Sequence, residues 1–189
     1  PFEIVASLDD GHLYLNGGIA IAKEGSLIFK DDIDTELSSE AAELYNSGWN
    51  YIPKYKDDFR MPRTLHFIHT WVAFLYTLGG LNLAFCLNYV FCFLSTLLFY
   101  KILHSFLKNP INTLFPSFLF LTSYIQIWFT KYPNTEIPFQ FLLLSLTYFF
   151  YRYSISNNNL DHFIYLMSLA LMFMTRIDGI AIFLCFYLL

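Results

Sequence analysis

The feature that most constrains this chain is a long run, from Thr64 to Tyr100, that contains no Asp, Glu, Lys or Arg. A membrane-spanning helix needs about 20 apolar residues, so this run is long enough for nearly two passes. Further uncharged runs follow almost to the end of the chain. Charged residues make up only 14% of the sequence, against about 25% in an average soluble domain. The sequence therefore predicts an all-α fold, a polytopic helix bundle in a membrane.

The first 63 residues differ from the rest in charge. They hold 12 of the 15 acidic residues and 6 of the 11 basic ones, so the acidic excess of the chain lies there. We expect residues 1–63 to form an external or lumenal loop and residues 64–189 to carry the spans. The negative charge gives no electrostatic support for a nucleic-acid partner. Because the chain starts at Pro1 and stops at Leu189 inside an apolar run, we expect it to be a fragment of a longer protein.

Polar turns and helix breakers divide residues 64–189 into candidate spans. Gly79-Gly80, followed by Asn82, marks the first break, and Asn109-Pro110 marks another. Between such breaks we place membrane helices at about 64–79, 82–103, 111–130, 137–153, 161–175 and 179–189.

Three basic residues orient these spans. Lys101, Lys108 and Arg152 fall in alternate short loops, and the positive-inside rule places such loops in the cytoplasm. The acidic loop and the turns TKYPNTE and TRIDG then share the external or lumenal face. The sequence thus predicts an integral, multi-pass protein of the plasma membrane or endoplasmic reticulum with its chemistry outside.

Two short helices are expected within the loop, at about 9–23 and 35–45. Gly25 and Gly48 close them, as glycines commonly do at helix ends. One apolar face of the first helix, suited to a membrane surface or to other helices, comprises Leu8, Leu15, Ile19 and Ala22.

Acidic residues at predicted helix starts are the first candidates for chemistry. Asp9 and Asp10 begin the first loop helix, and Glu136 begins the span after TKYPNT. Each carboxylate could simply cap a helix and interact with its dipole, with Thr135 or Asn134 as the cap beside Glu136. Alternatively, one of the two aspartates accepts a proton from an acceptor group.

Basic residues and histidines near the predicted boundaries are the remaining candidates. Lys131 could be a snorkelling boundary residue. Arg176 could pair internally with Asp178, or it could bind the phosphate of a lipid. His66 and His69 lie three residues apart and could bind phosphate, a metal or only water, which is a weak metal signal; we predict no metal site.

Four segments in this order resemble one family: DDGHLYLNGGIAIAKEGSL, RMPRTLHFIHTWVAFLYTLGG, TKYPNTEIPFQFLLL and SLALMFMTRIDGIAIF. The chain is similar to the GT-C membrane glycosyltransferases, in particular the protein mannosyltransferase and aminoarabinose-transferase-like group. The similarity covers essentially the whole chain, through the first external loop and the next several spans. Each segment is loose by itself, so the resemblance depends on their order and spacing.

The resemblance implies an inverting transfer of a sugar from a polyprenyl-phosphate donor to a protein, lipid or glycan acceptor. It implies no further cofactor, and it covers both metal-independent and metal-assisted mechanisms. The catalytic base falls on Asp9 or Asp10, where this chain has Asp-Asp instead of Asp-Glu, and Glu136 is a supporting carboxylate. Residues implied to contact substrates, with the donor phosphate near Arg176 and Lys131, are Arg176, Lys131, His66, Tyr14 and Asp178.

Two other classes of function compete with this interpretation. A transporter or channel fragment would line a pathway with membrane-embedded charges, whereas no predicted span carries a charge near its middle. A non-catalytic membrane assembly subunit would lose no activity when the acidic candidates are neutralised.

Overall fold

The computed structural model describes residues 10–30, 51–52, 59–62, 67–176, 179 and 181–182. The chain divides into two compact units, residues 1–84 and residues 85–189, and each is described by itself. Helices make up most of the described part, as predicted. The first unit also holds three short strands that the sequence analysis did not anticipate.

The first described element is helix α1 (Asp10–Glu24). It ends at Gly25, which has a φ of 69° and whose N–H donates to the carbonyl of Ile21 at 2.9 Å. A left-handed glycine is a common helix terminator because it lacks the Cβ that disfavours this conformation. The first predicted loop helix and its stop are therefore confirmed, whereas the second, at 35–45, lies outside the described residues.

The inward face of α1 differs from the predicted one. Its buried large side chains include Leu13 and Tyr14, whereas Leu15 and Ile19 are only half-buried. Gly18 explains the difference, since a Cβ placed there would lie 2.5 Å from the Cβ of Val72. The absent side chain lets α1 approach helix α4 (Phe67–Phe85) closely, so the glycine side of α1 faces inward.

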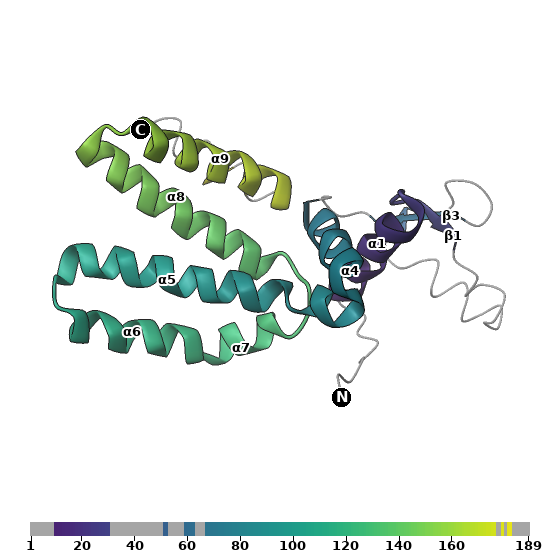
Figure 1. Ribbon diagram of the computed structural model, residues 1–189, viewed down its shortest axis with the longest axis horizontal. Helices are drawn as coiled ribbons and strands as arrows, with labels where there is room; N and C mark the ends of the chain where they lie inside the picture. Colours follow the sequence, from purple (N-terminus) through teal and green to yellow (C-terminus); the bar gives the residue numbers. More distant parts are fainter. Residues whose placement is uncertain are drawn as a thin grey trace. The chain divides into compact units, whose positions relative to one another are not determined.

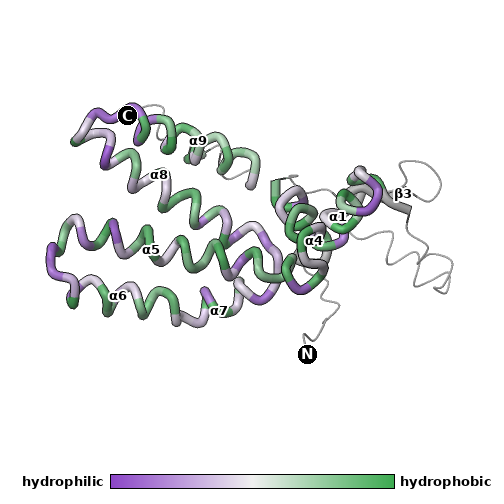
Figure 2. The backbone as a smooth tube through the Cα atoms, viewed as in Figure 1, coloured by the Kyte–Doolittle hydropathy of each residue, from purple (hydrophilic) through white to green (hydrophobic). Residues whose placement is uncertain are grey.

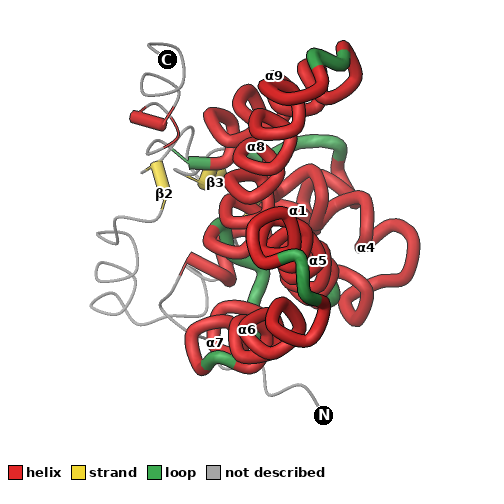
Figure 3. Tube along the Cα trace, turned by 90° about the vertical axis from the view of Figure 1, so that its left-hand side faces the viewer, coloured by secondary structure: helices red, strands yellow, loops and turns green. Residues whose placement is uncertain are grey.

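Three strands form a small antiparallel sheet in the first unit, drawn in yellow in Figure 3. They are β1 (Phe29–Lys30), β2 (Tyr51–Ile52) and β3 (Phe59–Pro62), in the order β1-β3-β2. Aromatic and β-branched residues favour strands, but two-residue strands are too short to show an alternating pattern. That is why the sequence analysis missed them.

Two glycines interrupt α4. Gly79 has φ −154° and ψ 21°, and Gly80 has φ 67° and ψ −158°, so the uninterrupted part, residues 67–78, rises only about 18 Å. The break predicted at these glycines is confirmed. The next helix begins at Leu87 instead of the predicted 82, because residues 81–85 return to helical geometry and complete α4.

The second unit is a row of antiparallel helices (Figure 1). Helix α5 (Leu87–Leu107) lies between α8 (Glu136–Ser156) and the pair α6 (Pro110–Thr122) and α7 (Tyr124–Thr130), while α9 (Asn159–Thr175) packs on α8. Asparagines form the tight turns at one end, because the side chains of Asn109 and Asn158 accept from the backbone N–H groups of Ile111 and Leu160. Such side-chain acceptors are typical helix N-caps.

Besides the later start of α5, the predicted ranges match the helices of this unit with one further correction. The predicted span 111–130 is two helices, because Ser123 adopts extended geometry (φ −61°, ψ 144°) and its hydroxyl accepts from the N–H of Gln126. The spans predicted at 137–153 and 161–175 correspond to α8 and α9. Of the last predicted span, only residues 179 and 181–182 are described.

Large apolar side chains lie on the outside of the second unit, and its interior holds both apolar and polar side chains. Among the described helices, α4 and α5 are long and apolar enough to cross a membrane. Figure 2 shows that apolar residues occupy much of the middle stretch of each helix in the second unit, whereas hydrophilic residues gather near the helix ends. Exposed large apolar side chains of α6 and α7 include Ile111, Leu114, Phe115, Phe118, Tyr124 and Ile125. Buried polar side chains include Asn88, Thr113, Gln126, Ser145, Asp161 and Ser168.

Candidate functional site

The antiparallel order of the second unit brings several candidate residues to one end of it. The connection between α7 and α8, residues 131–135, lies at the same end as Arg176, the residue after α9 (Figure 1). The connections at 108–109 and 157–158 lie at the opposite end. Lys131, Glu136 and Arg176 therefore share one end of the second unit.

Glu136 and Arg176 form an ion pair between α8 and the end of α9. The Nη1 atom of Arg176 donates to Oε1 of Glu136 at 2.6 Å and to the hydroxyl of Thr135 at 3.3 Å. The guanidinium also lies over the ring of Phe139, with 5.9 Å between its Cζ and the ring centroid. The Arg176 backbone N–H donates to the carbonyl of Met172 at 3.1 Å and so continues the last turn of α9.

This pair revises one local prediction. Thr135 occupies the N-cap position of α8 but makes no capping hydrogen bond with its side chain; its hydroxyl accepts from Arg176 instead. Asp178, the internal partner also expected for Arg176, lies outside the described residues. The partner that the structure gives to Arg176 comes from a helix 40 positions away in the sequence.

The exposure of the pair decides what it can do chemically. The side chains of Arg176 and Glu136 are 32% and 37% exposed, so both remain accessible to a ligand. A guanidinium binds phosphate in a bidentate geometry, and a carboxylate at a helix N-terminus stays favourable through the helix dipole. The arrangement is therefore suited to holding an anion beside a carboxylate.

Asn88, which the sequence analysis did not single out, fixes the connection that precedes Glu136. It is fully buried, and its Nδ2 atom lies 3.0 Å from the carbonyl of Phe129, 2.6 Å from that of Tyr132 and 2.7 Å from Oδ1 of Asn134. Asn134 in turn donates to the carbonyl of Phe129 at 3.0 Å. The only sequence signal was an amide in a charge-free run, which does not reveal its partners.

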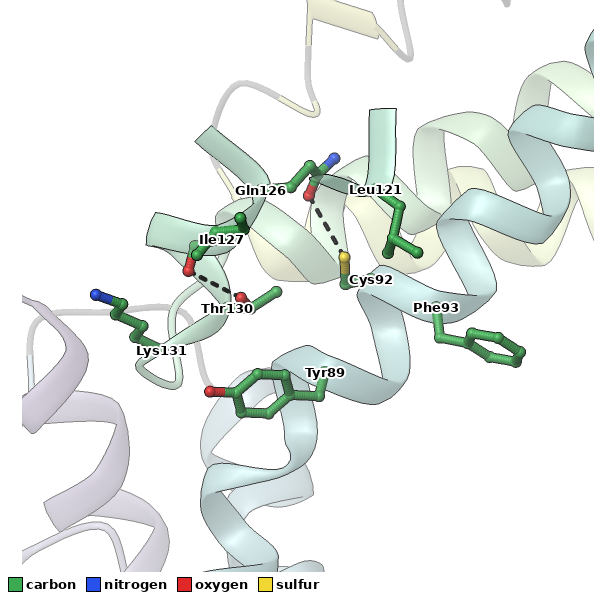
Figure 4. Close-up of a pocket in the computed structure, with 8 residues that line it drawn as sticks. All are labelled: Tyr89, Cys92, Phe93, Leu121, Gln126, Ile127, Thr130 and Lys131. Atoms are coloured by element: carbon green, nitrogen blue, oxygen red, sulfur yellow. Dashed lines mark hydrogen bonds between the residues drawn. The ribbon is translucent and has the colours of Figure 1, made fainter. Parts of the chain in front are cut away.

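Lys131 lies at the same end of the second unit but is not part of the Glu136–Arg176 pair. It is exposed, and its ammonium lies 5.5 Å from the ring centroid of Trp128. Together with residues of α5, α6 and α7 it lines a cavity of about 260 Å³ (Figure 4). No carboxylate among the described residues forms a salt bridge with it.

The remaining predicted site residues belong to the first unit or lie outside the described part. Tyr14 is buried and packs against His69, with ring centroids 5.2 Å apart. Asp10 is the first residue of α1. Asp9, His66 and Asp178 lie outside the described residues. Within the described part, no group of three or more His, Cys, Asp or Glu residues is arranged to hold a metal ion.

Comparisons with protein-family models, with curated proteins and with solved structures find no match to this chain.

Proposed function

We propose that the chain is part of a multi-pass membrane glycosyltransferase that moves a sugar from a polyprenyl-phosphate donor to an acceptor. The observation that carries the proposal is the accessible Glu136–Arg176 pair, which joins two helix ends on one side of the second unit. The many exposed large apolar side chains of the second unit support the membrane location, because lipid is the surrounding in which exposed Ile, Leu and Phe are favourable.

The proposed reaction takes place on the external or lumenal face. The family resemblance assigns the role of base to Asp9 or Asp10, a carboxylate that removes the proton from the acceptor hydroxyl as its oxygen attacks the anomeric carbon. The bond between that carbon and the phosphate oxygen breaks, and the lipid phosphate leaves with the electron pair. Arg176 stabilises the negative charge that develops on the phosphate, and Glu136 holds the guanidinium in place. The configuration at the anomeric carbon is inverted.

Release of lipid phosphate tests this proposal. Full-length protein is incubated with a panel of polyprenyl-phosphate sugars, and free polyprenyl phosphate is measured. We expect Arg176→Gln to lower release roughly a hundredfold or more, as loss of one stabilising group in such sites does. We expect the double variant Asp9→Asn with Asp10→Asn to abolish release while the protein still inserts into membranes.

Lys101→Gln is the matched control, since Lys101 is an exposed basic residue of α5 far from the Glu136 end. It should release lipid phosphate at the rate of the unchanged protein. Unchanged release by the Arg176 and Asp9/Asp10 variants would refute the site. Uptake of a solute into proteoliposomes without any lipid-linked sugar would favour a transporter instead.

A further inference from the structure

The cavity between α5, α6 and α7 is separate from the Glu136–Arg176 pair and has its own polarity. The residues that line it include Tyr89, Phe93, Leu121, Ile127 and Lys131. Tyr89 and Lys131 lie near helix ends, the first close to the start of α5 and the second directly after α7. Phe93 lies one helical turn further along α5, about 6 Å away by helix rise. In Figure 4 the hydroxyl of Tyr89 and the ammonium of Lys131 point to the same side, away from Phe93 and Leu121.

The walls of the cavity offer little to a water-soluble ligand. Gln126 and Cys92 contact each other, with 3.7 Å between Oε1 and Sγ, and the hydroxyl of Thr130 donates to the carbonyl of Ile127 at 3.0 Å. Both contacts are drawn in Figure 4. These polar atoms of the wall are thus engaged within the protein, and most of the remaining lining is apolar. The ligand that matches such a surface is a hydrocarbon chain.

The positive charge of Lys131 at the open end of the cavity favours a ligand with an anionic head group. Lys131 is exposed, and no carboxylate among the described residues pairs with it. An ammonium at the end of an apolar groove is complementary to an anion that is attached to an apolar tail. The volume, about 260 Å³, lies just below the range of about 300–1,000 Å³ typical of whole-ligand pockets, so the groove holds a single chain and leaves the head outside.

We propose that this groove binds one acyl chain of an anionic phospholipid, with the phosphate of the head group at Lys131. The ligand is a resident lipid of the bilayer and takes no part in sugar transfer. The proposal requires the second unit to lie in a membrane but does not depend on the proposed enzymatic activity. It is therefore tested by lipid retention, which a failure of the glycosyltransferase assay would not affect.

The experiment measures which lipid stays with the full chain. The protein is reconstituted in vesicles of equal parts dioleoylphosphatidylglycerol and dioleoylphosphatidylcholine, extracted in a mild nonionic detergent, and analysed by mass spectrometry for lipid bound per chain. A lysine near a membrane surface favours anionic lipid by an amount that corresponds to about fivefold. We expect about one retained lipid per chain, with the anionic lipid favoured about fivefold.

Two variants test the two halves of the site, and each has a matched control. Lys131→Gln should abolish the preference for the anionic lipid, whereas Lys108→Gln, at the opposite end of the unit, should leave it intact. Ile127→Trp should fill the groove and lower retention of both lipids severalfold. Ile125→Trp is its control, because Ile125 is exposed on the same helix but does not line the cavity.

Several results would overturn the proposal. Wild-type protein that retains no lipid, or that retains both lipids equally, contradicts it directly. So does unchanged retention in Ile127→Trp, or a loss in Ile125→Trp of the same size. If millimolar inorganic phosphate removes the anionic preference while Ile127→Trp keeps normal retention, the site binds a free anion and no acyl chain.

Discussion

Replacement of Asn88 should destabilise the second unit far more than the small size of this side chain suggests. The amide nitrogen lies within 3.0 Å of three acceptors, the carbonyls of Phe129 and Tyr132 and Oδ1 of Asn134. A side-chain amide has two N–H groups, so it satisfies two of these acceptors at a time. A buried acceptor left without a donor costs about 1–3 kcal/mol. Asn88→Ala should therefore lower the free energy of unfolding by about 2–4 kcal/mol.

A second substitution separates hydrogen bonding from packing. Asn88→Asp keeps the shape of the side chain, but an ionised carboxylate has no donor and would face three oxygen atoms. We expect Asn88→Asp to be more destabilising than Asn88→Ala at neutral pH, although alanine leaves the larger void. If packing alone mattered, the order would be reversed.

Thermal unfolding of the full chain in a mild detergent measures both effects. For a chain of this length, 1 kcal/mol corresponds to about 2–4 °C, so Asn88→Ala should unfold at least about 4 °C below the unchanged protein. Asn112→Ala is the control, because Asn112 is an exposed amide of α6. Equal unfolding temperatures for Asn88→Ala and Asn112→Ala would refute the anchoring role.

Two further predictions concern packing elsewhere. Arg152 is 46% exposed and its Nε lies 3.3 Å from Oδ2 of Asp161, which is only 2% exposed. Arg152→Gln should therefore lower the unfolding temperature more than Asp161→Asn does. The first variant leaves the buried Asp161 carboxylate without its cation, whereas the second leaves the exposed Arg152 guanidinium in water. Equal unfolding temperatures for the two variants would contradict this prediction. Gly18→Ala should cost about 1–3 kcal/mol by overpacking, since the new Cβ meets Val72, and the exposed Asn16→Ala should be neutral in the same unfolding assay.

The helices could be predicted from the sequence because their causes are local. Apolar runs and stop signals such as Gly25 and Gly79 placed most helix boundaries within a few residues. The break at Ser123 was missed because a serine between apolar residues is ordinary within a membrane helix, and only its extended backbone ends α6. The inward face of α1 was missed because it follows from the absent side chain of Gly18, whereas the periodicity of larger residues indicated another side.

The site could be predicted only in part, because its contacts join distant segments. The sequence indicated Glu136 and Arg176 separately, each at a helix end, and their order along antiparallel helices brings them to the same end. It did not indicate that they pair, since the contact joins residues 40 positions apart. The role of Asn88 was missed for the same reason, because its acceptors lie 41 to 46 positions further along the chain.

The conformation of Gly80 has a mechanical consequence for the chain. It lies four residues before the boundary between the two units, in a region of φ and ψ that is essentially reserved for glycine. No atom lies within 4 Å of the point where a Cβ would be, so the requirement comes from the backbone torsions and not from crowding. The polypeptide thus bends within α4 at Gly80, where a single methyl group would resist the bend without touching any neighbour.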